Sequence, residues 1–358
     1  MMEQYITIPE RLKAVYNRLQ DDESRMIFNG RLQYFLDSNP NLFIKNVVCP
    51  IHEKLKLNRV VDELKAMKAN GREIICYGAG VFGRNISTIL NYYGLGPDYF
   101  CDTDVKKQQL ASIKIISPDE LFSNHRESMV IIGTWRYLEE IRGILFSGGF
   151  KKDDIYDQFA IEEGNGDENY WHHSFFSPVP NEIYIDGGVF DCGSIKHFIK
   201  FAGEYNKIYG FEPSSTAYSQ CLQIIKSDNL MRIEMINKGL WSEETTLRFN
   251  DTGNGNARID NGGTDKIAVS TIDKSVGTDC ITFIKMDIEG AELEALKGAK
   301  ETILHNKPRL AICVYHKPED ILEIPLYLSE IVPEYKFWLR HETPGMGQTV
   351  LYAVAEKI

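Results

Sequence analysis

The sequence predicts an α/β protein made of two Rossmann-like three-layer domains, preceded by a helical extension. Its 358 residues are enough for two domains. Short apolar runs alternate with amphipathic helical stretches along most of the chain, which is the pattern of βαβ units. Two glycine-rich turns, at Gly78 and Gly187, each follow an apolar run and precede a helical stretch. Each turn therefore begins a new series of units.

Composition narrows the function. The net charge of −11 opposes a phosphate backbone, so we expect no nucleic-acid partner. The seven cysteines are scattered without a CxxC motif, which favours a reducing compartment. No signal-peptide core and no apolar run of membrane-spanning length is evident. We therefore expect a cytoplasmic protein without a membrane partner.

Apolar residues recur at helical spacing early in the chain and predict a helical N-terminal segment over residues 1–60. The first Rossmann-like domain is predicted over residues 61–160. The acidic, glycine-containing run EEGNGDEN is typical of a linker, which we place at residues 161–180. The second domain is predicted over residues 181–358, with a long helix from Ala291 to Leu304 and a closing antiparallel hairpin.

The first domain carries a GxGxxG fingerprint formed by Gly78, Gly80 and Gly83. Such a turn lets a pyrophosphate approach the N-terminus of a helix, and Asp102, at the end of the next strand, could accept hydrogen bonds from ribose hydroxyls. A nucleotide or sugar nucleotide is therefore one possible ligand. Alternatively, the glycines only permit tight helix–strand packing. Residues 70–157 resemble the small Rossmann-like modules that accompany glycan-modifying enzymes.

Acidic residues in the second domain fall at the predicted carboxyl ends of strands, where open α/β sheets bind ligands. Asp186 ends the strand before the glycine turn, and Glu212 ends the next strand, where a carboxylate can bind both ribose hydroxyls. Asp287, Glu289 and Glu292 follow a later strand. Together these positions predict a ligand site along one edge of the sheet.

Residues 182–354 resemble the FkbM-family, S-adenosylmethionine-dependent methyltransferases. The resemblance is carried, in the family's order, by IDGGVFDCGS, GFEPS, NKGLWS, STID, FIKMDIEGAE, LKGA, CVYH and QTVLYA. It implies a seven-stranded class I methyltransferase sheet and O-methylation of a hydroxyl group. The acceptor would be a small molecule such as a sugar or glycan precursor, which suggests glycan biosynthesis.

The resemblance also implies roles for individual residues. Asp186 and Gly188 would form the cofactor turn, Glu212 would bind the ribose, and Asp287 would lie near the methionine end or the acceptor. Cys192 stands where the family commonly has a second turn glycine. A side chain at that position could narrow the cofactor turn.

O-methylation also needs a group that receives the hydroxyl proton. We expect His316 to be that base, because it follows a predicted strand and its imidazole can be neutral near pH 7. Asp287 would orient His316 or the acceptor, and His341 is a second candidate. Alternatively, His316 only caps the strand end.

Several alternatives stay open. Glu289 and Glu292 could favour the helix dipole or cap the helix, or could bind a divalent cation with Asp287, although we expect no metal. The first fingerprint could serve a nicotinamide-dependent oxidoreductase, or the protein could be a non-catalytic nucleotide-binding protein. A homo-oligomer is compatible with the sequence.

Overall fold

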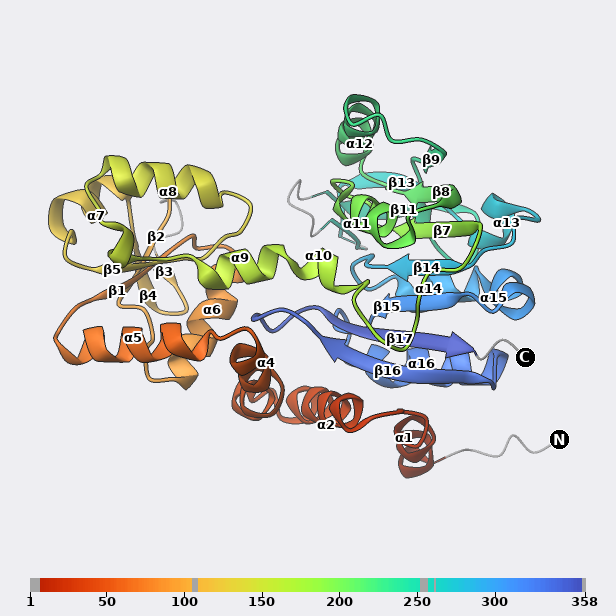
Figure 1. The fold of residues 1–358 in the computed structure, drawn as a ribbon, viewed down its shortest axis with the longest axis horizontal. Coiled ribbons are helices and arrows are strands. Elements are labelled where there is room, and N and C mark those ends of the chain that lie inside the picture. The colour runs from red at the N-terminus through yellow and green to blue at the C-terminus, as the bar shows by residue number, and fades with distance from the viewer. Residues whose placement is uncertain (1–6, 105–108, 252–256, 261, 356–358) are drawn as a thin grey trace. The chain divides into compact units, whose positions relative to one another are not determined.

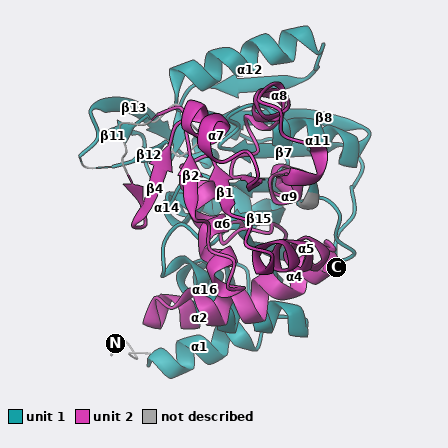
Figure 2. Ribbon diagram, turned by 90° about the vertical axis from the view of Figure 1, so that its left-hand side faces the viewer, with its two compact units in different colours: residues 1–32, 167–340, 349–358 teal, residues 33–166, 341–348 magenta. Residues whose placement is uncertain are grey.

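The computed structural model describes residues 7–104, 109–251, 257–260 and 262–355. The chain forms two compact units, shown in different colours in Figure 2. Unit 1 comprises residues 1–32, 167–340 and 349–358, and unit 2 comprises residues 33–166 and 341–348. Each unit contains a large sheet of its own (Figure 1). Each also has its own hydrophobic core.

The sheet of unit 2 has the strand order β3-β4-β2-β1-β5-β6. Its strands are β1 (Ile74–Tyr77), β2 (Tyr99–Cys101), β3 (Gln109–Leu110), β4 (Ile113–Ile116), β5 (Met129–Ile132) and β6 (Ile155–Tyr156). All neighbours are parallel except β3 and β4. If the five parallel strands are numbered in chain order, they lie side by side in the order 3-2-1-4-5, which is that of a Rossmann sheet.

Helical segments surround this sheet or precede it. They are α2 (Asp22–Asp37), which continues into unit 2 from unit 1, α3 (Pro40–Phe43), the π-helix η1 (Ile44–Val48), α4 (Cys49–Lys54), α5 (Asn58–Ala69), α6 (Val81–Tyr92), α7 (Pro118–Asn124), α8 (Leu138–Ser147), the 3-10 turn η2 (Lys152–Asp154) and α9 (Gln158–Gly164). The short helix α10 (Gly166–Asn169) leads from unit 2 into unit 1. The strands β1 and β5 are buried throughout, so both faces of the sheet are covered.

Unit 1 contains the seven-stranded sheet, in the order β16-β17-β15-β14-β7-β8-β9. Its strands are β7 (Glu182–Gly187), β8 (Tyr205–Phe211), β9 (Ile233–Ile236), β14 (Phe283–Met286), β15 (Arg309–Cys313), β16 (Tyr335–His341) and β17 (Thr349–Ala355). The pairs from β15 to β9 are parallel, whereas β17 runs antiparallel to β15 and neighbours β16. The predicted number of strands is therefore confirmed.

The helices of unit 1 are α1 (Ile8–Tyr16), α11 (Gly193–Ala202), α12 (Ser215–Ser227), α13 (Ile272–Val276), α14 (Glu292–Lys297), α15 (Lys300–Asn306) and α16 (Asp320–Ile331). The prediction of a single helix from Ala291 to Leu304 is wrong, because the helix is interrupted at Gly298, between α14 and α15. A Cβ atom at Gly298 would lie 2.0 Å from the Trp241 carbonyl oxygen. Close backbone approach therefore requires glycine there.

A second, four-stranded sheet in unit 1 was not predicted. It has the order β10-β13-β11-β12 and consists of β10 (Gly239–Leu240), β11 (Thr245–Asn250), β12 (Arg258–Ile259) and β13 (Asp265–Ser270). Phe249, Ile267 and Val269 form its small buried core. The alternation of apolar and polar residues from Thr246 to Asn250 in β11 is the signal that could have predicted this sheet.

The structure divides the chain differently from the predicted boundaries. The N-terminal segment 1–60 is not a separate element, since its first part belongs to unit 1 and the rest to unit 2. Within unit 1, α1 packs against α16, and the Arg11 guanidinium lies 2.6 Å from the Glu323 carboxylate. The remainder contributes Val60, Val61 and Leu64 to a core of unit 2.

The predicted linker at residues 161–180 is not an extended, exposed connection. It includes the end of α9 and all of α10, and continues into Tyr170 and Trp171, which are each only 3% exposed. The Trp171 ring contacts the rings of Tyr184, Phe198 and Phe283 in the core of unit 1. Aromatic burial therefore overrides the linker-like composition of the preceding acidic run.

Among the described residues, no helix is both long and apolar enough to cross a membrane. The described cysteines are all free thiols, and five of them are buried. Buried thiols of this kind pack as small apolar groups.

Candidate functional site

A cavity of unit 1 opens over the carboxyl ends of three neighbouring strands. Gly188 follows the last residue of β7, Glu212 follows β8 and Asp287 follows β14, and all three line the cavity. The space, including its open mouth, is about 840 Å³, which is the size of a small-molecule site. The structure thus brings together three of the residues that the sequence placed at one edge of the sheet.

The Glu212 side chain is held rigidly at the cavity wall. Its carboxylate accepts hydrogen bonds from the backbone N–H groups of Phe190, at 3.0 Å, and Ser214, at 2.8 Å. Burial raises the pKa of Glu212, although both backbone hydrogen bonds oppose the shift. The carboxylate is only partly satisfied by these two donors and can accept further hydrogen bonds from a ligand's hydroxyl groups.

The glycine turn after β7 depends on Gly188. Its φ of 79° lies in the left-handed region, and a Cβ atom there would lie 2.1 Å from the Asp287 carbonyl oxygen. Only glycine allows the backbone after β7 to approach the backbone after β14 this closely. The turn therefore shapes the cavity through its backbone.

Asp186 does not line the cavity itself but lies near the end of β7, two residues before Gly188. Its carboxylate is completely buried, accepts a hydrogen bond of 2.5 Å from the Ser194 hydroxyl, and lies 3.1 Å from the Lys285 ammonium. The register of the sheet places Lys285 directly beside Asp186. The same ammonium donates to the Gly188 carbonyl at 3.2 Å. Asp186 and Lys285 thus support the turn from beneath.

Sequence reasoning missed Lys285, although a lysine within the apolar run FIKM was a visible signal. A lysine that is 3% exposed needs a buried partner of opposite charge.

Cys192 does not narrow the cofactor turn as the sequence suggested. Its side chain is completely buried in the core of unit 1 and is not among the residues that line the cavity. The residue adopts a left-handed φ of 64° at the start of α11. That conformation is the physical reason why glycine is favoured at this position, and here cysteine adopts it.

The four-stranded sheet supplies a second wall of the cavity. Gly239, Leu240, Phe249, Ile259 and Ile267 from this sheet line it. The wall also contains Asp251, whose carboxylate accepts a hydrogen bond of 2.7 Å from the Ser214 hydroxyl, and Arg258.

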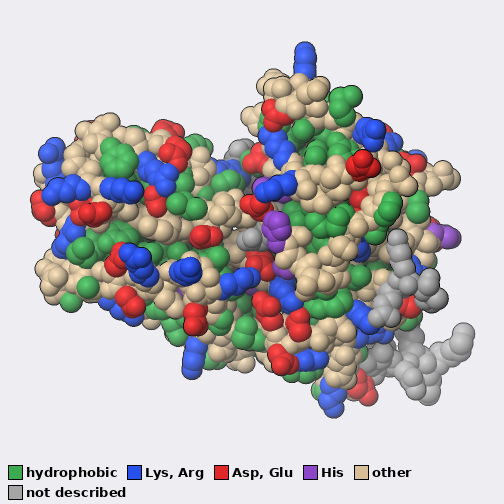
Figure 3. All heavy atoms as spheres, viewed as in Figure 1, with side chains coloured by type: hydrophobic (Ala, Val, Ile, Leu, Met, Phe, Trp, Pro, Cys, Tyr) green, Lys and Arg blue, Asp and Glu red, His purple; other side chains and the backbone are tan. Residues whose placement is uncertain are grey.

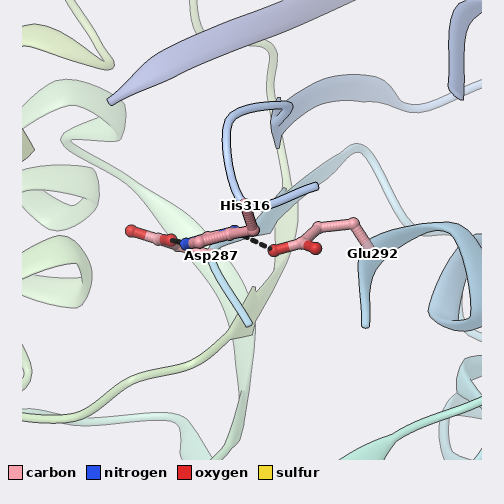
Figure 4. A group of neighbouring side chains, drawn as sticks. All are labelled: Asp287, Glu292 and His316. Carbon is pink, nitrogen blue, oxygen red and sulfur yellow. Dashed lines mark hydrogen bonds and ion pairs between the residues drawn. The ribbon is translucent and has the colours of Figure 1, made fainter. Parts of the chain in front are cut away.

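Five polar side chains gather beyond the carboxyl end of β14. His316 lies between the carboxylates of Asp287 and Glu292 (Figure 4). Its Nδ1–H group donates to Glu292 Oε1 at 2.9 Å, and its Nε2 atom lies 3.4 Å from Asp287 Oδ1 and 3.6 Å from Glu289 Oε2. The Tyr315 hydroxyl donates to Asp287 Oδ1 at 3.1 Å. Asp287 and Glu289 face the cavity, so they connect it to this group.

The structure does not support the expectation that His316 is a neutral base near pH 7. Burial alone would lower the pKa of His316, but the carboxylates of Glu292, Asp287 and Glu289 outweigh burial and raise it to about 9. With only these neighbours, the ring is therefore protonated at neutral pH and cannot accept a proton.

Two acids of the group have distinct environments. Burial raises the pKa of Glu289 to about 7, although His316 opposes the shift. Glu289 also has a left-handed φ of 56°, a strained backbone conformation of the kind that occurs at functional sites. Glu292 accepts a hydrogen bond of 2.9 Å from the Ile288 N–H group. Because Ile288 precedes α14 and its N-cap residue Ala291, this bond ties the preceding loop to the helix and does not cap it.

His341 is not among the residues that line the cavity. Its side chain belongs to the buried residues at the end of β16, and its Nε2–H group donates to the Gly345 carbonyl at 2.9 Å. The hydrogen bond and burial give His341 a structural role, so the second candidate for the base is not supported.

The first fingerprint is explained by packing. A Cβ atom at Gly83 would lie 1.9 Å from the Gly78 carbonyl oxygen, and one at Gly78 would lie 2.9 Å from the Gly133 carbonyl oxygen. The Asp102 carboxylate accepts a hydrogen bond of 2.7 Å from the Ala79 N–H group, so it ties down the loop itself. Gly80 alone has open space around it. These contacts favour the packing interpretation over a nucleotide site.

Comparison with protein families gives two matches in separate parts of the chain. Residues 187–337 match the model described as the methyltransferase FkbM domain, and residues 52–145 match the model described as a C-methyltransferase C-terminal domain. No curated protein shows significant similarity to the chain.

Several solved structures are similar to this chain at low identity. Methyltransferase FkbM from Methylobacillus flagellatus is 20% identical, with 87% of this chain and 100% of that chain covered and a TM-score of 0.48. An rRNA methylase from Streptococcus thermophilus is 16% identical, with 49% and 88% covered and a TM-score of 0.34. Fibrillarin from Aeropyrum pernix, with bound S-adenosyl-L-methionine, is 10% identical, with 53% and 74% covered and a TM-score of 0.34.

The two family matches and the seven-stranded sheet define the class: the protein is an S-adenosylmethionine-dependent methyltransferase. The residues that match the FkbM methyltransferase domain lie in unit 1.

Proposed function

We propose that the protein transfers a methyl group from S-adenosylmethionine to a hydroxyl group of a sugar-type small molecule, with the cofactor bound in the cavity over β7, β8 and β14. The observation that carries this proposal is the alignment of Gly188, Glu212 and Asp287 at the ends of these three strands. Bound S-adenosylmethionine would supply an electrophilic methyl group carried by a sulfonium sulfur.

The residues of the cavity suit such a ligand pair. The Glu212 carboxylate is placed to accept hydrogen bonds from vicinal hydroxyls, as a ribose requires. Asp251, Asp287 and Glu289 add negative charge, which favours a cationic sulfonium and neutral hydroxyl groups over an anionic substrate. On the face in Figure 3, basic and acidic side chains are interspersed, without the single broad basic patch of a nucleic-acid site.

We assign the role of proton acceptor to Glu289 in place of His316. Glu289 lies at the cavity wall, and its Oε2 atom is 3.6 Å from His316 Nε2. A carboxylate whose pKa is near 7 is well matched to general-base catalysis at neutral pH. Asp287, held by the Tyr315 hydroxyl, would orient the acceptor hydroxyl for in-line attack.

The test is single-turnover methyl transfer from radiolabelled S-adenosylmethionine to a panel of free sugars, glycosides and sugar nucleotides. We expect a product with a new O-methyl group, identified by NMR. A C-methyl product would contradict hydroxyl methylation, and it is the outcome that the match at residues 52–145 would favour.

The pH dependence tests the base. Because Glu289 must be deprotonated to accept a proton, the single-turnover rate should rise with pH through about 7. Glu289→Gln should lower the rate by about 10²–10⁴-fold and remove this rise, with S-adenosylmethionine affinity retained. A Glu289→Gln rate within a few-fold of the unchanged protein would exclude Glu289 as the base.

A further inference from the structure

The four-stranded sheet presents an apolar face to the cavity of unit 1. Phe249 on β11 and Ile259 on β12 are directly opposite each other in the strand pairing, so their side chains share one face of the sheet, and both line the cavity. Ile267 on β13 lines it as well. Phe249 and Ile267 are only 2% and 8% exposed. This part of the wall therefore suits an apolar ligand group.

Helix α12 lines the same cavity from a different element. Thr216, Ala217 and Gln220 lie on one face of this helix, and all three line the cavity. The beginning of α12 adjoins Glu212, because Ser214, its N-cap residue, donates its backbone N–H group to the Glu212 carboxylate at 2.8 Å. A ligand bound by Glu212 thus has α12 beside it.

One carboxylate lies at the edge of the apolar face. Asp251 follows Phe249 by two residues, so strand alternation directs both side chains to the same face, and Asp251 lines the cavity. Its Oδ2 atom accepts a hydrogen bond of 2.7 Å from the Ser214 hydroxyl. A carboxylate can accept about four hydrogen bonds, so the Ser214 hydroxyl does not exhaust it. Ser214 thus links Asp251 to Glu212.

We propose that Asp251 selects the adenine base of the cofactor by accepting a hydrogen bond from the exocyclic amino group, with the adenine ring against the apolar face. This inference rests on the proposed position of the cofactor, in which Glu212 binds the ribose. Adenine is attached to the ribose and is a flat ring whose amino group donates hydrogen bonds. An apolar wall with one acceptor at its edge, joined to Glu212 through Ser214, matches both properties.

The other acids of the cavity are less suited to the base. Asp287 and Glu289 follow β14, and β7 lies between β14 and β8 in the sheet, so a whole strand separates them from the end of β8 at Glu212. Both also lie near the His316 ring, at 3.4 and 3.6 Å from its Nε2 atom. We therefore assign the base to the four-stranded sheet and the reacting groups to the end of β14.

The test compares two ligands of the unchanged full-length chain by isothermal titration calorimetry. One is S-adenosylhomocysteine, and the other is its analogue with hydrogen in place of the exocyclic amino group. We expect S-adenosylhomocysteine to bind at least about tenfold more tightly, which is the effect of one charge-assisted hydrogen bond. Equal affinities for the two ligands would overturn the proposal without any variant.

A variant assigns the acceptor. Asp251→Ala should bind both ligands with nearly equal affinity, because the amino group has lost its acceptor, with folding checked by circular dichroism. Loss of the link to Ser214 would by itself weaken both ligands alike, so the preference for the amino group separates recognition from support of the wall. Asp265→Ala is the matched control, because Asp265 is exposed on β13 of the same sheet and does not line the cavity. A preference that persists in folded Asp251→Ala protein would overturn the proposal.

A second ligand separates the base from the methionine portion, whose ammonium group is also a donor to carboxylates. Methylthioadenosine has the base and the ribose but lacks this ammonium group. We expect Asp251→Ala to weaken binding of methylthioadenosine by the same factor as binding of S-adenosylhomocysteine. If only S-adenosylhomocysteine were weakened, Asp251 would bind the methionine portion and the proposal would be wrong.

Failure of this inference and failure of the proposed function are distinguishable, because none of these measurements needs a methyl acceptor. If Glu212→Ala weakens S-adenosylhomocysteine while Asp251→Ala keeps the preference for the amino group, only the assignment of the base is wrong. If neither variant changes the affinity, or if S-adenosylhomocysteine does not bind the unchanged chain, the proposed cofactor position is wrong as well.

Discussion

Buried charges at the residue scale support the cofactor turn through Lys285 and Asp186. Lys285→Met would leave the Asp186 carboxylate buried without its cation, although Ser194 still donates to it. We expect a loss of about 3–5 kcal/mol in the free energy of unfolding of unit 1, measured by urea denaturation. Lys274→Met is the control, since its side chain is 66% exposed, and it should change stability by less than about 0.5 kcal/mol. Equal stabilities of the two variants would contradict a supporting role for the pair.

Glu212 is the residue whose change should affect the cofactor most directly. Glu212→Ala removes the charge-assisted hydrogen bonds to the ribose, so S-adenosylmethionine binding should weaken by about 1.5–3 kcal/mol, or roughly 10- to 150-fold. Isothermal titration calorimetry measures the change. Glu234→Ala, at an exposed position on β9, should leave the affinity unaltered. If S-adenosylmethionine binds to Glu212→Ala with the same dissociation constant as to Glu234→Ala, the assignment of Glu212 is wrong.

At the element scale, the glycines of the fingerprint before α6 differ in how closely other atoms approach them. Gly83 is in close contact with neighbouring backbone, whereas Gly80 has open space around it. Gly83→Ala would press a methyl group into the Gly78 carbonyl, so unit 2 should lose about 1–3 kcal/mol or more. Gly80→Ala meets no atom within 4 Å and should cost no more than about 1 kcal/mol. Thermal unfolding measures both. If Gly80→Ala were instead the more damaging change, packing would not explain the motif.

Secondary-structure elements were predicted well where their sequence pattern is local. The strands β1 and β9, for example, coincide with short, mainly apolar runs of the sequence. The break between α14 and α15 was not, because the atom that requires glycine at position 298 belongs to Trp241, far away in the sequence. The end of a helix or strand can thus be predicted from the sequence only when the residues that cause it lie within that helix or strand.

At the scale of the whole molecule, pH should affect stability through buried acids. Burial raises the pKa of Glu163 to about 7, although a hydrogen bond from the Gly345 N–H group opposes the shift. A raised pKa means that the folded state binds the proton more tightly, so stability falls as pH rises from about 4.5 to 7. Glu163→Gln should raise the melting temperature above pH 7 and change it little below pH 5. If Glu163→Gln changed the melting temperature by the same amount at every pH, the carboxyl group of Glu163 would not have the raised pKa.

The sequence by itself determined the α/β class, the two Rossmann-like sheets and the set of acids at the carboxyl ends of β8 and β14. These features follow from the local alternation of strands and helices and from the rule that parallel strands present their carboxyl ends at one edge. Only the tertiary structure decided what each acid does. Asp186 meets Lys285 through strand register, and His316 is surrounded by three carboxylates from another segment, which turns an expected base into a cation. Burial and the charge of spatial neighbours set a side chain's protonation, and neither quantity is local in the sequence.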